Sequence, residues 1–221
     1  MATAKFLSIS DAEQFIAKAL VANEVPSADA LIVAQLMVKS DLVGADGHGL
    51  FRLPAYLKRI RAGGVNLKPN IRIEREKGAT ALINGDNALG HLVMNKAVEV
   101  AIEKVKEHSV CWVGSHYGNH SGAASVYVRK LAEQGFIGIY MAVGNANHMA
   151  PWGGIDLLLS TNPIAIAVPA GEHPMVLLDI ATTVAAYGKV KLAAQKGESM
   201  PSDWMIDRQG QPITDPKRSS E

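Results

Sequence analysis

Apolar residues recur at helical spacing through the first third of the chain. The pattern predicts three helices, over residues 10–22, 26–42 and 51–61. Ser10 and Glu13 form a capping box at the start of the first helix, and Gly63 with Gly64 stops the third. The opening third of the protein is therefore predicted to be helical.

After Lys68 the helical spacing gives way to short apolar runs separated by helices. The runs predict strands over residues 79–83, 110–114, 136–143, 163–168 and 176–180, of which the last two are typical of central strands. Helices are predicted over residues 92–106, 122–133 and 183–195, and a turn over residues 84–87. Strands that alternate with helices indicate an α/β fold behind a helical N-terminal region.

The composition narrows the class of protein. With 48% apolar residues, 19% charged residues and a net charge of +1, the chain lacks the basic balance that nucleic-acid and membrane-surface binders show. The single cysteine, Cys111, excludes an internal disulfide, and its apolar neighbours predict a small buried strand residue. The N-terminus has no signal-peptide run, so we expect a cytoplasmic protein with neither nucleic acid nor membrane as a partner.

One long stretch, residues 134–155, contains no Asp, Glu, Lys or Arg and is nominally long enough to cross a membrane. Several glycines, His148 and Pro151 interrupt it. We therefore expect a buried strand that leads into an active-site loop.

A histidine between two glycines is the first candidate for chemistry. His48 lies between Gly47 and Gly49 at a predicted sharp turn, and an unperturbed pKa near ~6.5 suits proton transfer at neutral pH. A turn histidine with one backbone hydrogen bond explains the spacing equally well. Arg52 offers a fork that matches a carboxylate, or is a solvated arginine on a helix face. Tyr56, one turn later, could orient a substrate or pack against the core.

The second candidate cluster follows the strand that is predicted to end near Gly114. His120, between Asn119 and Ser121, precedes a helix that begins near Gly122, which is where α/β proteins place ligands. It could be a second acid or base, or an incidental histidine in a capping region. Seven histidines occur in the chain, but none pair at metal-ligand spacing, so we propose no metal.

Small, polar and glycine residues gather at the ends of the later strands, over residues 145–154, 160–163 and 179–183. Such residues let a ligand approach the backbone closely. No G-x-G-x-x-G motif follows a strand, and no G-x-x-x-x-G-K-[ST] motif occurs. The sequence therefore does not support a standard Rossmann or P-loop nucleotide site.

Together these segments resemble the malate/L-lactate dehydrogenase family, whose members are NAD(P)-dependent 2-hydroxyacid oxidoreductases unrelated to the Rossmann-type lactate and malate dehydrogenases. The similarity runs nearly from end to end. It is carried by ordered blocks at residues 45–49, 52 with 56, 61–64, 85–87, 119–123, 150–154, 161–163, 179–183 and 188–189.

The resemblance implies a helical N-terminal region followed by a mixed-sheet, non-Rossmann nicotinamide-binding domain. It places a helical domain that contributes to the substrate site over residues 1–75, and a cofactor-binding domain over residues 76–221. It also implies a homodimer with the active site near the subunit interface. Members usually run well past the position of Glu221, so the resemblance implies that the cofactor domain is incomplete at its C-terminus.

Site residues follow from the resemblance by matching position. His48 and His120 correspond to the proton-handling pair, with His48 favoured as the acid or base, and Arg52 corresponds to the carboxylate clamp. We also assign Tyr56 to the substrate site. The cofactor, NAD or NADP, would contact Asn145, Asn162, Asp179, Ile180, Ala181 and Thr182.

The expected reaction transfers a hydride between the nicotinamide cofactor and a small 2-hydroxy or 2-oxo acid such as malate or lactate. A reductase of cyclic imines, Δ1-piperideine- or Δ1-pyrroline-2-carboxylate, is the alternative. A catalytically inactive fragment that acts only in dimerisation is the second alternative. Gly47 stands where many members have a serine, which bears on the choice of substrate.

Overall fold

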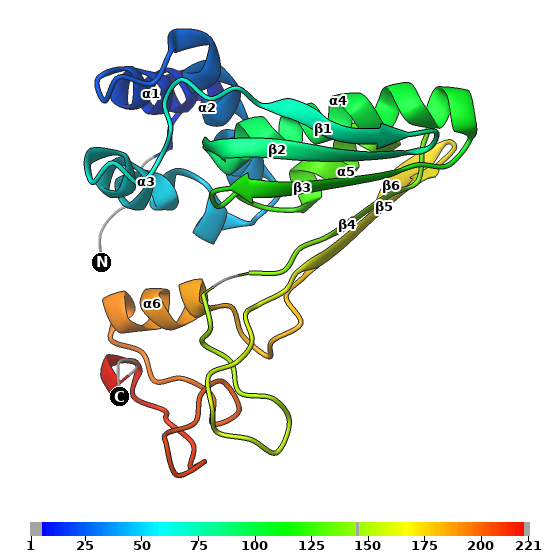
Figure 1. Ribbon diagram of the computed structural model, residues 1–221. Helices are drawn as coiled ribbons and strands as arrows, with labels where there is room; N and C mark the ends of the chain where they lie inside the picture. The colour runs from blue at the N-terminus through cyan, green and yellow to red at the C-terminus, as the bar shows by residue number, and fades with distance from the viewer. Residues whose placement is uncertain (1–5, 145, 219–221) are drawn as a thin grey trace.

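The computed structural model describes residues 6–144 and 146–218 (Figure 1). Its N-terminal part contains α1 (Ile9–Val21), α2 (Ser27–Leu42) and α3 (Leu53–Arg61), with two 3-10 turns, η1 (Asp46–His48) and η2 (Leu50–Arg52), between α2 and α3. One apolar cluster joins the three helices. The predicted helices are thus confirmed, but the predicted cap of α1 is wrong. The cap is Ser8, whose hydroxyl accepts a hydrogen bond from the Asp11 amide at 3.0 Å.

The first sheet has the order β1-β2-β3, formed by β1 (Arg72–Lys77), β2 (Thr80–Ala88) and β3 (Trp112–Gly118). β1 is antiparallel to β2, whereas β3 is parallel to β2 because α4 (Gly90–His108) forms the crossover between them. The sequence did not predict β1, since each of its six side chains is exposed and the strand has no apolar alternation.

The turn predicted over residues 84–87 is wrong. β2 continues to Ala88, and its register with β3 shifts between Asn84 and Ala88. Asp86 and Asn87 occupy positive φ values of 47° and 57°, so the turn-forming residues bend a continuous strand instead of ending it. The bend brings Asn87 to the loop that follows β3.

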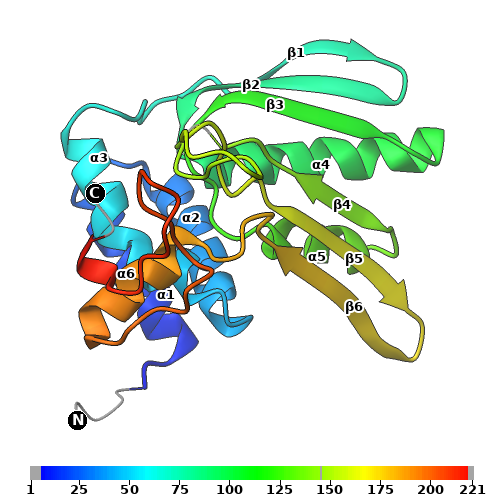
Figure 2. The same ribbon diagram turned by 90° about the horizontal axis from the view of Figure 1, so that it is seen from below.

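The second sheet is antiparallel, with the order β4-β5-β6, and consists of β4 (Gly138–Met141), β5 (Ile164–Ala170) and β6 (His173–Ile180). Helix α5 (Ser125–Ala132) covers one face, where Val128 packs with the buried Ala165 and Ala167 (Figure 2). β5 is central, as predicted, but β6 lies at the edge. The strand predicted to be buried, β4, exposes Ile139 and Met141, because none of the described elements covers the second face of the sheet.

Helix α6 (Tyr187–Lys196) begins the C-terminal segment, which ends in the 3-10 turn η3 (Pro216–Arg218). Met200 and Ile213 of this polar, turn-rich tail are buried against Val190 and Ala193 of α6. Figures 1 and 2 show α6 on the side of the molecule where α3 lies. A pocket described below lies on this side, between the N-terminal helices and α6.

Cys111 precedes β3 and is partly buried, and its thiol donates to the Ala101 carbonyl at 3.3 Å. Burial raises the pKa of this thiol. None of the described helices is both long and apolar enough to span a membrane. The mixed α/β class is confirmed, and the division at residue 75, which falls within β1, stays a prediction.

Candidate active site

A hydrogen bond from the backbone to Asp41 holds the turns on either side of Gly49, next to His48. The carboxylate of Asp41, near the end of α2, accepts a hydrogen bond from the Leu50 amide at 2.9 Å. A Cβ atom on Gly49 would lie 1.8 Å from that carboxylate, so only glycine fits between the two 3-10 turns. The second glycine of the motif therefore has a steric role, which places His48 at the mouth of η2.

Asn119 holds the second histidine in place. Its side-chain amide donates to the carbonyls of Asn87 and Ala88, both at 2.9 Å, while its oxygen accepts from Arg59 Nε at 2.6 Å. Gly90 fits directly against this loop, because a Cβ atom there would lie 2.0 Å from the Asn119 carbonyl oxygen. The bend in β2 and the start of α4 thus fix the backbone immediately before His120.

The two predicted histidines meet, although they are far apart in the sequence. The rings of His48 and His120 stack with their centroids 5.3 Å apart and their planes at 16°. The hydroxyl of Tyr56 lies 2.7 Å from Nδ1 of His120. Tyr56 is buried, so the core-packing interpretation is correct for its ring, while its hydroxyl reaches the site.

The surroundings of His120 select one protonation state. Burial raises the pKa of Tyr56, so its phenol is protonated and donates to His120 Nδ1. The Gly122 amide donates to the same nitrogen at 3.3 Å. Burial of the imidazole, together with the charges of His48 and Arg52, lowers the pKa of His120, although the residue as a whole keeps contact with solvent. His120 is therefore neutral, with its proton on Nε2.

His48 experiences a different balance of charges. Burial lowers its pKa and so does the Arg52 guanidinium, but the carboxylate of Asp179 acts in the opposite direction. Its Nδ1 is buried and has no hydrogen-bond partner among the described residues. Of the two histidines, His48 is the one whose charged form a neighbouring carboxylate favours.

A third histidine, His91, lies behind the pair and was not predicted. It is fully buried at the start of α4, and its ring meets Tyr56 edge to face at 5.4 Å. Neither ring nitrogen has a partner within the described part of the chain, and burial lowers its pKa to about 3. A Cβ atom on Gly122 would lie 2.7 Å from His91 Nε2. The only sequence signal was a histidine directly after a glycine.

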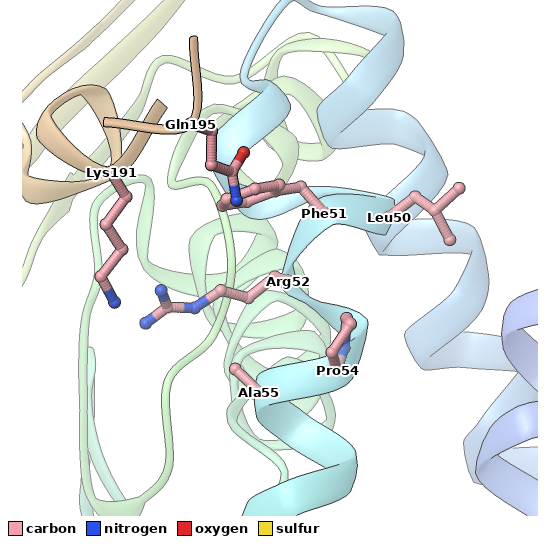
Figure 3. A pocket seen from close by; sticks show the side chains of 7 residues that line it. All are labelled: Leu50, Phe51, Arg52, Pro54, Ala55, Lys191 and Gln195. Atoms are coloured by element: carbon pink, nitrogen blue, oxygen red, sulfur yellow. The ribbon is translucent and has the colours of Figure 1, made fainter. Parts of the chain in front are cut away.

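Arg52 lines a pocket of about 610 Å³ between the N-terminal helices and α6. Its walls are Leu50, Phe51, Arg52, Pro54 and Ala55 on one side, and Lys191 and Gln195 on the other. Figure 3 shows the Arg52 guanidinium and the Lys191 side chain extending into the same space. Lys191 was not predicted, because only the tertiary fold brings α6 to this position.

The predicted cofactor residues lie at the ends of β5 and β6. Asp179 accepts a hydrogen bond from the Ser125 amide at the start of α5, at 2.8 Å. Asn162 adopts a positive φ of 35° and accepts from the Gly144 amide at 3.0 Å. Thr182 donates its amide and its hydroxyl to the Thr161 carbonyl, at 2.8 and 3.0 Å.

The remaining polar groups of this block suit a ligand with hydroxyl or amide groups. The second carboxylate oxygen of Asp179 and the amide nitrogen of Asn162 make no hydrogen bond within the described residues. Ile180 is exposed and Ala181 is half-buried next to them. Asn145 lies outside the described residues. No three His, Cys, Asp or Glu side chains of the described chain are grouped as metal ligands would be.

Comparison with known proteins identifies the relatives of this chain. The family model for malate/L-lactate dehydrogenase matches residues 7–221. A malate dehydrogenase of Pyrococcus horikoshii is 43% identical over 196 residues, which are 89% of this chain and 54% of that protein. An L-sulfolactate dehydrogenase of Methanothermobacter thermautotrophicus is 39% identical over 211 residues, 96% of this chain and 61% of that protein.

A solved structure agrees with both. The sulfolactate dehydrogenase of Methanocaldococcus jannaschii superimposes with a TM-score of 0.87 at 38% identity, covering 98% of this chain and 62% of that one. The chain thus spans somewhat more than half the length of the relatives that it matches. The match extends over both of its sheets and its N-terminal helices, so the chain belongs to the malate/L-lactate dehydrogenase family.

Proposed function

We propose that the protein is an NAD- or NADP-dependent oxidoreductase that interconverts a small 2-hydroxy acid and its 2-oxo acid. The observation that carries the proposal is the stack of His48 on His120 beside the guanidinium of Arg52, which forms no ion pair with a carboxylate among the described residues. A proton carrier next to a carboxylate-binding group is what the reduction of a 2-oxo acid requires. Membership of a dehydrogenase family supports the same reaction.

Within this reaction we assign the proton transfer to His48. The Asp179 carboxylate favours its charged form, so an imidazolium there can donate to the substrate oxygen as that oxygen gains negative charge. His120, which burial keeps neutral and whose Nδ1 accepts from Tyr56, has its Nε2–H as a hydrogen-bond donor toward the same oxygen. Tyr56 thereby acts on the substrate through His120.

Arg52 and the block at the ends of β5 and β6 bind the two reactants. The guanidinium of Arg52 would take the substrate carboxylate and orient C2. The cofactor would supply or accept the hydride. The residues that we propose to hold it are Asn145, Asn162, Asp179, Ile180, Ala181 and Thr182. The electrostatic effect of Asp179 on His48 supports a cofactor block adjacent to the proton donor.

The test replaces His48 by alanine. Reduction of 2-oxo acids, followed by the absorbance of NADH or NADPH, should lose about 100-fold or more in kcat, the usual effect of removing a general acid. The matched control is His116→Ala. His116 of β3 lies outside the site, where its Nε2 is 2.5 Å from a carboxylate oxygen of Glu74 on β1. Near-normal turnover in His48→Ala would contradict the assignment.

The same assay has a pH dependence with a defined sign. The pKa of His48 lies below the ordinary value of 6.5, so its acid form accumulates only as the pH falls through and below that value. The reductive rate of the unchanged protein should therefore rise toward lower pH, and the His48→Ala variant should lose this rise.

We also propose that the protein forms a homodimer through the uncovered face of the second sheet. Opposed pairs on this face are apolar, among them Ile139 with Ile166 and Ile166 with Leu178. Ile139 is 58% exposed and Leu178 is 41% exposed. A contiguous apolar sheet face is typical of an interaction surface, because leaving it in water is unfavourable.

A further inference from the structure

Two cations from distant parts of the sequence face one pocket. Arg52 belongs to η2, whereas Lys191 belongs to α6, and both line the pocket between these elements. In Figure 3 the guanidinium and the Lys191 side chain extend toward the same space, with the Gln195 amide at its upper edge. The remaining walls are apolar apart from the backbone.

Among the residues that the structure describes, no acidic side chain lines this pocket to balance the two charges. Among the described residues, neither Arg52 nor Lys191 forms an ion pair with a carboxylate. Arg52 hydrogen-bonds through its side chain to the phenol of Tyr56, which is neutral, and within the described chain its buried Nε has no partner. The ammonium of Lys191 lies 5.0 Å from the centre of the Tyr187 ring. Two like charges that converge without a counter-ion favour an anionic ligand between them.

We propose that Lys191 is a specificity-determining residue that binds a second acidic group of the substrate. This inference rests on the proposed function, in which Arg52 holds the carboxylate next to the reacting carbon. The far end of the substrate then points across the pocket toward α6, where the Lys191 ammonium meets a second carboxylate or a sulfonate. The preferred substrate is accordingly a dianionic 2-oxo or 2-hydroxy acid.

A monoanionic acid has no second anionic group that could bind Lys191. Its methyl end would leave the exposed ammonium in water, which costs little, so such an acid is accepted but gains no affinity from α6. A second anion would instead form a charge-assisted hydrogen bond with Lys191. The selectivity therefore resides in one lysine, whereas Arg52 serves both classes of acid.

A phosphate of the cofactor is the other source of negative charge that could occupy the pocket. The location of the pocket argues for the substrate, because Arg52 belongs to the 3-10 turn next to the one that carries His48, whereas the proposed cofactor block lies at the ends of β5 and β6. The two sources predict different ligands that lose affinity when Lys191 changes.

The test uses Lys191→Gln in the whole chain, with Lys196→Gln as the matched control. Lys196 lies on the same helix but lines a different pocket, with Trp204. Calorimetry should show that the unchanged protein binds L-malate more tightly than L-lactate. Lys191→Gln should weaken L-malate binding about tenfold and leave L-lactate unchanged, as expected for one charge-assisted hydrogen bond. Lys196→Gln should change neither.

Turnover provides the second arm. Lys191→Gln should raise KM for oxaloacetate about tenfold, with KM for pyruvate, NADH and NADPH unchanged. Equal binding of L-malate and L-lactate by the unchanged protein would overturn the proposal, and so would binding of neither. A rise in KM for NADH or NADPH with unaltered L-malate binding would assign the pocket to a cofactor phosphate and overturn it as well.

The two arms separate this inference from the proposed function. If no 2-oxo acid is reduced, the proposed oxidoreductase activity fails, while calorimetry still decides whether Lys191 selects a dianion. If the unchanged protein and Lys191→Gln both reduce pyruvate and oxaloacetate equally well, the proposed activity stands and the role of Lys191 is rejected.

Discussion

At the scale of single residues, neighbours set three histidines to different tasks. Burial keeps His120 neutral, and the hydrogen bonds that Tyr56 and Gly122 donate to its Nδ1 place the proton on Nε2. His48 receives the opposing influences of Arg52 and Asp179. His91 is sealed in the core with a pKa of about 3. Histidine thus occurs in three different electrostatic environments within one cluster of rings.

Replacing Tyr56 by phenylalanine tests the control of His120. The ring remains in the core, but the donor to Nδ1 is lost, so the Nε2–H tautomer becomes less favoured and the pKa of His120 should rise. Nitrogen-15 NMR of the histidine rings reports both changes. Because one hydrogen bond contributes about 1 kcal/mol, kcat should fall about fivefold to tenfold.

Serine in place of Tyr56 would disturb packing, so phenylalanine is the informative change. An unchanged His120 spectrum in Tyr56→Phe would show that the phenol does not set the tautomer. A changed spectrum with unchanged kcat would show that the tautomer is irrelevant to turnover.

At the scale of elements, close approaches of backbone and side chains position the site. Gly122, at the turn before α5, has a φ of +79° and lies against His91 of α4. Gly90 similarly lets α4 begin directly against the loop that carries His120. The glycines therefore determine how tightly α4 and α5 enclose the ring cluster.

Gly122→Ala should destabilise the protein through two separate effects. The left-handed backbone costs about 1 kcal/mol for alanine, and displacement of His91 adds about 1–3 kcal/mol. Gly44→Ala is the matched control, because Gly44 has the same φ of +79° and nothing within 4 Å of its added Cβ. Urea unfolding measures both variants. Equal losses of stability would show that His91 yields without cost.

The success of sequence-based prediction also varies by element. The periodicity of α1 and α3 comes from one buried face each, which is visible in a linear pattern, whereas α2 and α4 are apolar on several sides because each contributes to more than one core cluster. β1 has no buried side chain, and Asn84 to Asn87 combine turn residues with strand pairing. These two elements were mispredicted because pairing with a neighbouring strand, and no apolar pattern, holds them in place.

At the scale of the whole molecule, the described elements cover only one face of the second sheet. α5 packs against Ala165 and Ala167, while the opposite face presents isoleucine, leucine, valine and methionine side chains to solvent. A sheet of this composition ordinarily packs on a second layer. The protein is therefore expected to associate through this face.

Ile139→Glu should weaken that association without unfolding the subunit, because Ile139 is 58% exposed and is not part of the buried core. Phe15→Glu on α1 is the matched control, with the same exposed fraction of 58% at a site remote from the sheet. Sedimentation velocity should show a dimer for the unchanged protein and the control, and monomer for Ile139→Glu. Dimers in all three would exclude this face as the interface.

The sequence by itself determined the α/β class and the N-terminal helices, and it singled out His48, His120 and Arg52 as candidates, because buried periodicity and local motifs are written in the order of residues. Only the tertiary structure decided that His48 stacks on His120, that His91 lies behind them and that Lys191 faces Arg52. These contacts join segments separated by tens to more than a hundred residues, and no local pattern specifies which packed surfaces bring them together.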